Sequence, residues 1–346
     1  FGHRVRALLP RGADYRAMRI APGRDLIAGI TVGVVALPLA LAFGITSGLG
    51  AAAGLITAIV AGTVAAVFGG SNLQISGPTG AMTVVLVPIV AEYGANGVLV
   101  VGLMAGLLLV VMAIAGLGRY VRFIPLPVIE GFTLGIAVII ALQQVPSALG
   151  VDVSGEQVVI VAVKSVGQWV TSPQWVPVAI AAGVAGLMIV AARLRIKPAV
   201  PVALIAVVAA TIVVQVADLD VATIGALPST LPLPSLPAFT FSDLRILIAP
   251  AVAVAALAAL ESLLSATVAD AMSVSQRHDP DRELFGQGLA NVASPLFGGI
   301  PATAAIARTA VNVRSGAVSR LSAIVHSAVL LVVVLALSTV VGLIPL

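Results

Sequence analysis

Long apolar runs, each close to the length of a membrane-spanning helix, follow one another through most of this chain. Of its 346 residues, 60% are hydrophobic and 9% are charged, whereas soluble domains carry about 25% charged residues. A helical span needs roughly 20 apolar residues, so about a dozen spans would fit. The sequence therefore predicts an all-α polytopic membrane protein.

The basic residues are distributed as membrane topology requires. Most of the 18 lysines and arginines fall on one side of the expected spans, beginning with a basic segment at residues 1–24. Because cytoplasmic loops are enriched in Lys and Arg, we expect a cytoplasmic N-terminus that lies at an anionic lipid surface in the cell (inner) membrane. This topology also explains the isoelectric point of about 10.1 without a nucleic-acid partner.

The stretch of residues 68–81 interrupts two apolar runs with glycine and polar side chains. Residues 73–76 can be extended, and Gly77-Pro78 breaks the chain before a helix of about 79–90 that is too short to span a membrane. Such a half-helix directs free N–H groups and the positive end of its dipole at the membrane interior, which suits an anion. An ordinary re-entrant loop or a proline-kinked span without ligand remains the alternative interpretation.

The second half of the chain repeats the first. Phe68-Gly69-Gly70 recurs as Phe297-Gly298-Gly299, and Ile124-Pro125-Leu126 recurs as Ile344-Pro345-Leu346. Seven expected spans separate corresponding elements, and an odd number inverts the second copy in the membrane. The repeat predicts a seven-plus-seven inverted-repeat fold with two broken helices, each preceded by a short extended segment. On this prediction the chain lacks about the last three spans.

The two broken helices would direct their N-termini at one another near the middle of the membrane. The residues expected at these ends, and therefore at the substrate site, are Thr79, Gly80, Ala81, Thr303, Ala304 and Ala305. Arg308 follows on the second short helix, where a lone arginine is costly unless it faces a partner or a wet cavity. It pairs with a protein carboxylate or a helix-end carbonyl, or it adds positive charge to an anion site.

Glu261 is the other charge expected inside the membrane. Three roles are open: a structural ion pair with Arg308, a proton acceptor for coupled transport, or a sodium ligand together with Ser265 and Thr303. Either ion-coupling role makes Glu261 and Ser265 the candidate residues for a coupling H⁺ or Na⁺. Beyond such an ion, we expect no cofactor and no metal site, because the chain has no cysteine and its three histidines lack metal-ligand spacing. No catalytic residues are expected and the chain is not predicted to be an enzyme.

Several motifs resemble those of the sulfate permease family, also called solute carrier family 26. They are Phe68-Gly69-Gly70-Ser71, Gln74-Ile75-Ser76-Gly77-Pro78, Gln287-Gly288-Leu289-Ala290-Asn291, Phe297-Gly298-Gly299-Ile300-Pro301-Ala302-Thr303, and Ala307-Arg308-Thr309-Ala310 with Asn312. The resemblance implies anion transport by movement of a core domain against a gate domain, in a homodimer, with a C-terminal cytoplasmic regulatory domain beyond this chain. It also implies that the anion lies between the helix ends at Thr79 and Ala304, with Arg308 nearby.

The resemblance further suggests a division of the chain. The expected parts are the N-terminal segment (1–24), core spans 1–4 (25–117), gate spans 5–7 (118–217), a proline-rich inter-repeat loop (218–242), core spans 8–11 (243–342) and the start of the second gate half (343–346).

One departure from the family pattern bears on the substrate. Plant and animal members often read Pro-Gln-x-x-Ala-Tyr in the first span, whereas this chain has Leu39 and Phe43 at the two polar positions. Losing both polar groups disfavours sulfate and favours a bacterial-type site for a carboxylate or bicarbonate.

The combined prediction is a secondary active transporter of small anions, of the bicarbonate, dicarboxylate or sulfate class. It works by alternating access and is coupled to H⁺ or Na⁺. The alternatives are an uncoupled anion channel or exchanger on the same fold and, with less support, a nucleobase–cation symporter.

Overall fold

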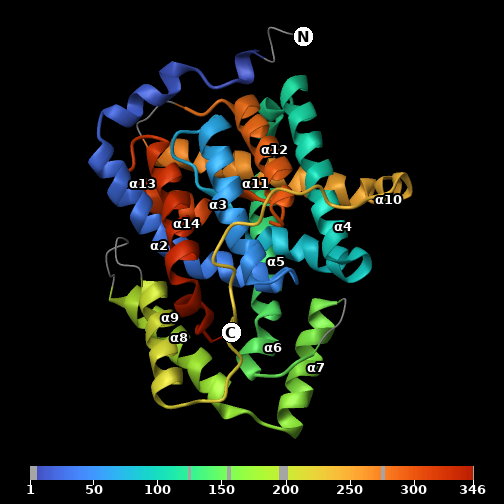
Figure 1. Ribbon diagram of the computed structural model, residues 1–346, viewed down its shortest axis with the longest axis vertical. Helices are drawn as coiled ribbons and strands as arrows, with labels where there is room; N and C mark the ends of the chain where they lie inside the picture. The colour runs from blue at the N-terminus through green and yellow to red at the C-terminus, as the bar shows by residue number, and fades with distance from the viewer. Residues whose placement is uncertain (1–5, 124–125, 154–156, 195–201, 274–276, 346) are drawn as a thin grey trace. The chain divides into compact units, whose positions relative to one another are not determined.

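A computed structural model describes residues 6–123, 126–153, 157–194, 202–273 and 277–345 (Figure 1). The chain divides into two compact units, one formed by residues 1–124 and 230–335 and the other by residues 125–229 and 336–346. Within the described residues, six helices are long and apolar enough to cross a membrane. This result agrees with the expected polytopic class.

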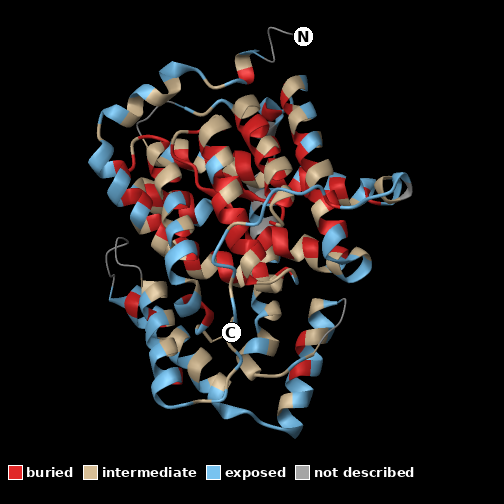
Figure 2. Cartoon of the chain, viewed as in Figure 1, coloured by how far each residue is buried: buried red, intermediate tan, exposed pale blue. Residues whose placement is uncertain are grey.

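The first unit holds both broken elements. Its segments are η1 (Gly12–Arg19), α2 (Pro22–Thr46), α3 (Ala51–Phe68), β1 (Ser76–Gly77), α4 (Gly80–Ala115), η2 (Gly118–Phe123), α10 (Phe241–Ile246), α11 (Ile248–Met272), α12 (Pro280–Leu296), β2 (Thr303–Ala304), α13 (Ile306–Arg314) and the larger part of α14 (Leu321–Gly342). Helix α12 packs against α3 and α4, and α11 packs against α4 and α13. Figure 2 shows buried residues concentrated along these helices.

Small residues let α2 and α3 approach closely. A Cβ atom on Gly54 of α3 would lie 2.0 Å from the carbonyl oxygen of Ala40 on α2. The backbones therefore touch where a larger side chain would hold them apart. Helix α2 begins at Pro22, a favoured first helical residue, and it continues through Pro38. Neighbouring helices can support such a proline inside a membrane helix.

Helix α4 contains a sharp bend at Gly94, where φ is 68° and ψ is −177°. Glycine reaches this conformation without the steric cost that a Cβ atom would add. The bend separates the short helix that begins at Gly80 from a following span that ends at Ala115. The structure thus reproduces the expected half-helix followed by a full span.

The two short strands join the broken elements. Strands β1 and β2 are antiparallel, with Ser76 opposite Ala304 and Gly77 opposite Thr303. Each strand lies immediately before a helix, so their pairing fixes the starts of α4 and α13 close together. Both strands are fully buried.

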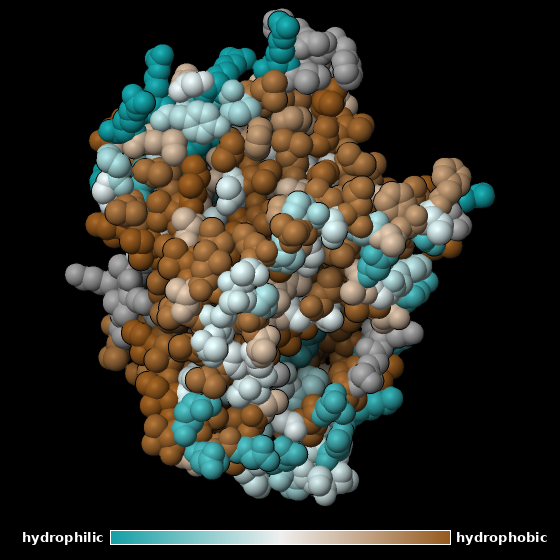
Figure 3. All heavy atoms as spheres, viewed as in Figure 1, coloured by the Kyte–Doolittle hydropathy of each residue, from teal (hydrophilic) through white to brown (hydrophobic). Residues whose placement is uncertain are grey.

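Within its described residues, the second unit contains five complete helices and the end of α14. The complete helices are α5 (Leu126–Gln143), α6 (Val145–Leu149), α7 (Val158–Thr171), α8 (Trp175–Arg193) and α9 (Val202–Val216). The rings of Trp169 and Trp175 meet edge to face, with 5.0 Å between their centroids. Apolar side chains cover much of the face seen in Figure 3, as lipid contact requires.

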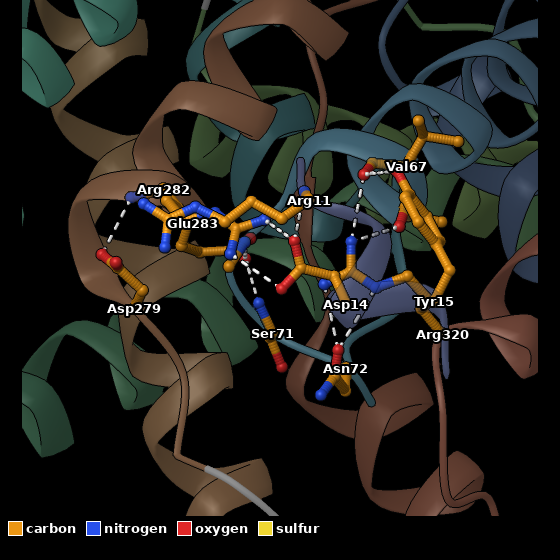
Figure 4. A network of polar contacts seen from close by, with 12 residues as sticks. Arg11, Asp14, Tyr15, Val67, Ser71, Asn72, Asp279, Arg282, Glu283 and Arg320 are labelled. Carbon is orange, nitrogen blue, oxygen red and sulfur yellow. Dashed lines mark hydrogen bonds and ion pairs between the residues drawn. The ribbon is translucent and has the colours of Figure 1, made fainter. Parts of the chain in front are cut away.

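The N-terminal segment is fastened to the first unit by η1. Tyr15 donates its hydroxyl to the carbonyl oxygen of Val67 at 2.9 Å, and Arg282 donates to Asp14 at 2.8 and 3.1 Å (Figure 4). Partial burial raises the pKa of Asp14, but hydrogen bonds from Arg282 and from the backbone of Arg11 hold it below its usual value. The segment expected at a lipid surface therefore has an inner face that contacts protein.

Candidate functional site

The first half-helix begins with a capped N-terminus. Thr79 is the extended N-cap residue of α4, with φ −132° and ψ 156°, and its Oγ1 accepts a hydrogen bond from Met82 N at 3.3 Å. Gly80 and Ala81 are the first helical residues, and both are buried. The first N–H groups of a helix have no acceptor within it, so this end offers backbone donors together with the positive end of a dipole.

The second half-helix begins later than the sequence suggested. Thr303 and Ala304 form β2, Ala305 is the N-cap, and α13 begins at Ile306. The cause is long-range pairing: Ala304 lies opposite Ser76, and Ala305 N donates to Ile75 O at 2.9 Å. The free N–H groups of this end therefore belong to residues just after Ala305, rather than to Thr303 and Ala304.

Glu261 of α11 joins the two broken elements. Its Oε2 accepts hydrogen bonds from Oγ1 of Thr79 at 2.9 Å and from Oγ1 of Thr303 at 2.6 Å. Glu261 as a whole residue is half-buried. One carboxylate oxygen therefore contacts a residue from each half of the repeat.

Ser265 lies one helical turn beyond Glu261 and has a different partner. Its Oγ donates to Thr309 Oγ1 at 3.1 Å, and the same Thr309 oxygen accepts from Ile75 N at 3.1 Å. Of the three residues expected to hold sodium, Glu261 and Thr303 are thus in contact, and Ser265 supports the neighbouring strand.

Arg308 is buried, with 1% of its surface exposed. Its Nη2 donates to the carbonyl oxygen of Pro78, whereas Nε and Nη1 have no hydrogen-bond partner within the described part of the chain. Among these residues Arg308 forms no ion pair with Glu261, although the two charges interact electrostatically. The arrangement favours the helix-end carbonyl as its protein partner and leaves the positive charge without a carboxylate in contact.

Leu39 and Phe43 both lie on α2, and both are half-buried. Neither belongs to the hydrogen-bonded cluster, because their side chains carry no polar atom. The structure therefore unites Thr79, Thr303, Glu261 and the start of α4, and it places Ser265 and the two apolar residues outside this cluster.

Polar side chains of α11 and α12 hold the broken segments in place. Asn291 donates Nδ2 to Ala302 O at 2.9 Å and accepts at Oδ1 from Ala302 N at 2.8 Å. Ser262 Oγ accepts from Ala304 N at 3.1 Å. Gln287 donates to Ser76 Oγ at 2.7 Å and to the buried Glu283 at 2.9 Å. We did not assign these roles from sequence, although amides spaced four residues apart in an apolar span signal inward-facing polar groups.

The cluster offers oxygen ligands and no soft metal site. Hydroxyl and carboxylate oxygens suit a hard cation such as Na⁺, or a proton on the carboxylate. No group of three or more His, Cys, Asp and Glu side chains that could hold a metal ion occurs among the residues described.

Comparisons with known proteins identify the family. The model of the sulfate permease family matches residues 23–346. The putative sulfate transporter YvdB of Bacillus subtilis is 44% identical over 322 residues, covering 90% of this chain and 59% of the relative. The bicarbonate transporter BicA of a Synechocystis species is 38% identical, covering 93% of this chain and 58% of the relative. The chain thus spans somewhat over half the length of these relatives.

Solved structures show the same fold. The transmembrane domain of a cyanobacterial bicarbonate transporter BicA aligns with a TM-score of 0.86 at 36% identity, covering 94% of this chain and 86% of that chain. SLC26A9 aligns with a TM-score of 0.83 at 16% identity, covering 99% of this chain and 59% of that chain, and supports the fold alone. The expected inverted-repeat fold and the expected family are both confirmed. The chain belongs to the sulfate permease family.

Proposed function

We propose that this chain is the membrane part of a secondary active transporter of small anions of the bicarbonate, dicarboxylate or sulfate class. The observation that carries the proposal is the meeting of two half-helix N-termini beside a buried arginine that contacts no carboxylate among the described residues. Backbone N–H groups, two helix dipoles and a guanidinium all stabilise negative charge. No acidic side chain other than Glu261 contacts this cluster in the described structure.

The names of the relatives support this range of substrates. They include a bicarbonate transporter and a putative sulfate transporter. The apolar side chains of Leu39 and Phe43 in the first span favour an anion that needs few polar side-chain contacts there, so bicarbonate or a carboxylate is our first choice.

We further propose that Glu261 couples transport to H⁺ or Na⁺. When the Glu261 carboxylate is ionised, its negative charge offsets the positive charge of Arg308, because the two groups interact electrostatically. A proton or sodium ion on Glu261 removes this offset and leaves the site net positive, so the cation and the anion favour each other's binding. The Thr79 and Thr303 hydroxyls, which already contact Glu261 at 2.9 and 2.6 Å, would turn their oxygens to a sodium ion.

The remaining parts of the proposal concern the whole protein. We propose a multi-pass protein of the cell inner membrane with a cytoplasmic N-terminus, which works as a homodimer and carries a C-terminal cytoplasmic regulatory domain. The basic N-terminal segment and the positive-inside bias support this orientation. Alternating access would arise from movement of one compact unit against the other.

Uptake by the full-length protein in proteoliposomes tests the proposal. Labelled bicarbonate, sulfate and C4-dicarboxylates are each supplied with and without an inward proton or sodium gradient. We expect one anion to accumulate only with a gradient. Glu261→Gln should abolish accumulation and retain anion exchange, whereas Glu92→Gln, at an exposed site on α4, should leave accumulation unchanged.

Three outcomes would contradict the proposal in different ways. Gradient-driven accumulation that survives Glu261→Gln removes the coupling role. Conductive flux with single-channel currents would indicate a channel on this fold. Saturable uptake of uracil or xanthine, with none of the anions transported, would instead indicate a nucleobase–cation symporter.

A further inference from the structure

His326 is a buried polar residue that the proposed transport cycle leaves without a role. It lies on α14 with 0% of its surface exposed, and neither ring nitrogen has a hydrogen-bond partner among the described protein atoms. Leaving a buried polar group unsatisfied costs about 1–3 kcal/mol. Buried polar groups are therefore nearly always paired, either with protein or with ordered water.

The register of α13 and α14 places His326 opposite Arg308. Asn312 of α13 donates Nδ2 to Ser322 Oγ of α14 at 2.9 Å, next to the turn that joins these helices. Arg308 lies one helical turn before Asn312 on α13, and His326 lies one helical turn after Ser322 on α14. Both residues are therefore one helical turn farther from the connection between the helices, on the same faces as Asn312 and Ser322. The electrostatic interaction between His326 and Arg308 agrees with this placement.

Two glycines let the backbone come close to these side chains. A Cβ atom on Gly77 would lie 2.7 Å from Nη1 of Arg308, and a Cβ atom on Gly62 would lie 3.8 Å from Cε1 of His326. The backbone of β1 therefore lies beside Arg308, and the backbone of α3 lies beside His326.

Burial and the nearby positive charge of Arg308 both disfavour a charged imidazole at His326. The neighbouring charged side chain is the cationic Arg308, and the carboxylate of Glu261 already accepts hydrogen bonds from two threonines. A neutral imidazole offers one nitrogen as an acceptor, and Arg308 has two nitrogens whose N–H groups need an acceptor. His326 can thus supply the hydrogen-bond acceptor that the guanidinium of Arg308 lacks.

We propose that His326 is a positioning residue for Arg308, which it holds through an ordered water that bridges the imidazole and the free guanidinium N–H groups. A buried water of this kind needs two to four polar partners, and the two side chains supply them. The bridge keeps Nη2 on the carbonyl oxygen of Pro78 and so holds the positive charge at the start of α4. This inference rests on the proposed anion transport.

Transport kinetics of the full-length protein in proteoliposomes test the inference. His326→Leu removes the acceptor, and we expect the KM for the transported anion to rise about tenfold, because a lost hydrogen bond to a charged group weakens binding by that order. The maximal rate per folded transporter should stay within about twofold. His326→Gln keeps an acceptor at similar length and should restore most of the affinity.

Ser327→Ala is the matched control. Ser327 is the next residue on α14, is 2% exposed, and donates to Ala58 O on α3 at 3.3 Å. Its loss disturbs the same helix interface without removing an acceptor for Arg308, so the KM should not change. If His326→Leu yields no folded protein, His326→Met, which also lacks an acceptor but is flexible, takes its place.

The outcomes separate this inference from the proposed function. If the unmodified protein transports no anion, the proposed function fails, and the inference fails with it. If it transports an anion with an unchanged KM in His326→Leu, or if His326→Gln is as impaired as His326→Leu, only the positioning role of His326 is refuted.

Discussion

Replacing Gly77 with alanine tests how tightly the start of α4 is built around Arg308. Gly77 has a φ of +157°, and an added Cβ atom would lie 2.7 Å from Nη1 of Arg308 and 3.3 Å from Cα of Ala58. Backbone strain at positive φ costs about 1–2 kcal/mol, and overpacking a filled site adds about 1–3 kcal/mol. The free energy of unfolding should therefore fall by about 2–5 kcal/mol.

Gly298→Ala supplies the matched control. Gly298 has a φ of +77°, but a Cβ atom there would meet nothing within 4 Å. We therefore expect only the strain contribution of about 1–2 kcal/mol. Denaturant titration of both variants in detergent measures the difference in stability, and proteoliposome uptake measures the KM for the anion.

The two variants should differ in function as well as in stability. Gly77→Ala displaces the guanidinium, so its KM should rise, whereas Gly298→Ala should transport with the KM of the unmodified protein. Equal losses of stability in the two variants, or an unchanged KM in Gly77→Ala, would refute this account of the space around Arg308.

Two further predictions concern hydrogen bonds of acidic side chains in the first unit. Glu283→Ala should destabilise the protein by about 1–3 kcal/mol for each stranded amide, because Oε2 of Glu283 accepts from Gly70 N at 2.9 Å and from Ser71 N at 3.0 Å; denaturant titration showing no loss would contradict this. Asp14→Asn should cost up to about 1 kcal/mol near neutral pH through its partner Arg282. Because the folded-state pKa of Asp14 lies below 3.8, this contribution is present above pH 3.8 and is lost as the pH falls through the lowered pKa. If the free energy of unfolding still differed between Asp14→Asn and the unmodified protein at the acid end of a pH series, this prediction would be wrong.

Local sequence was sufficient for the broken helices. Gly77-Pro78 marks the break before α4, and Phe297-Gly298-Gly299 marks the second break. Both signals are local, because glycine and proline act on the backbone directly. The same local evidence misplaced the start of α13, because Thr303 is drawn into β2 by pairing with Gly77, more than two hundred residues away.

Partners of buried polar groups were harder to predict. Glu261 was recognised as an intramembrane charge. Ser265 was grouped with it as a possible sodium ligand, whereas the structure pairs Ser265 with Thr309. Arg320 follows the second broken element, on the basic side of the expected spans, yet it is 2% exposed and donates to Asn72 and to backbone carbonyls at the end of α3. These hydrogen-bond partners depend on how segments far apart in the sequence pack together, and the pattern of residues within one segment cannot predict that packing.

Locating the bound anion tests the central claim most directly. Crystals of the full-length protein grown with selenate, and in parallel with bromide, would give anomalous difference density for an anion that competes with the transported substrate. The account predicts a peak within hydrogen-bonding distance of the first N–H groups of α4 and α13, beside Arg308. A competing anion bound elsewhere, with no peak between these helix ends, would contradict it.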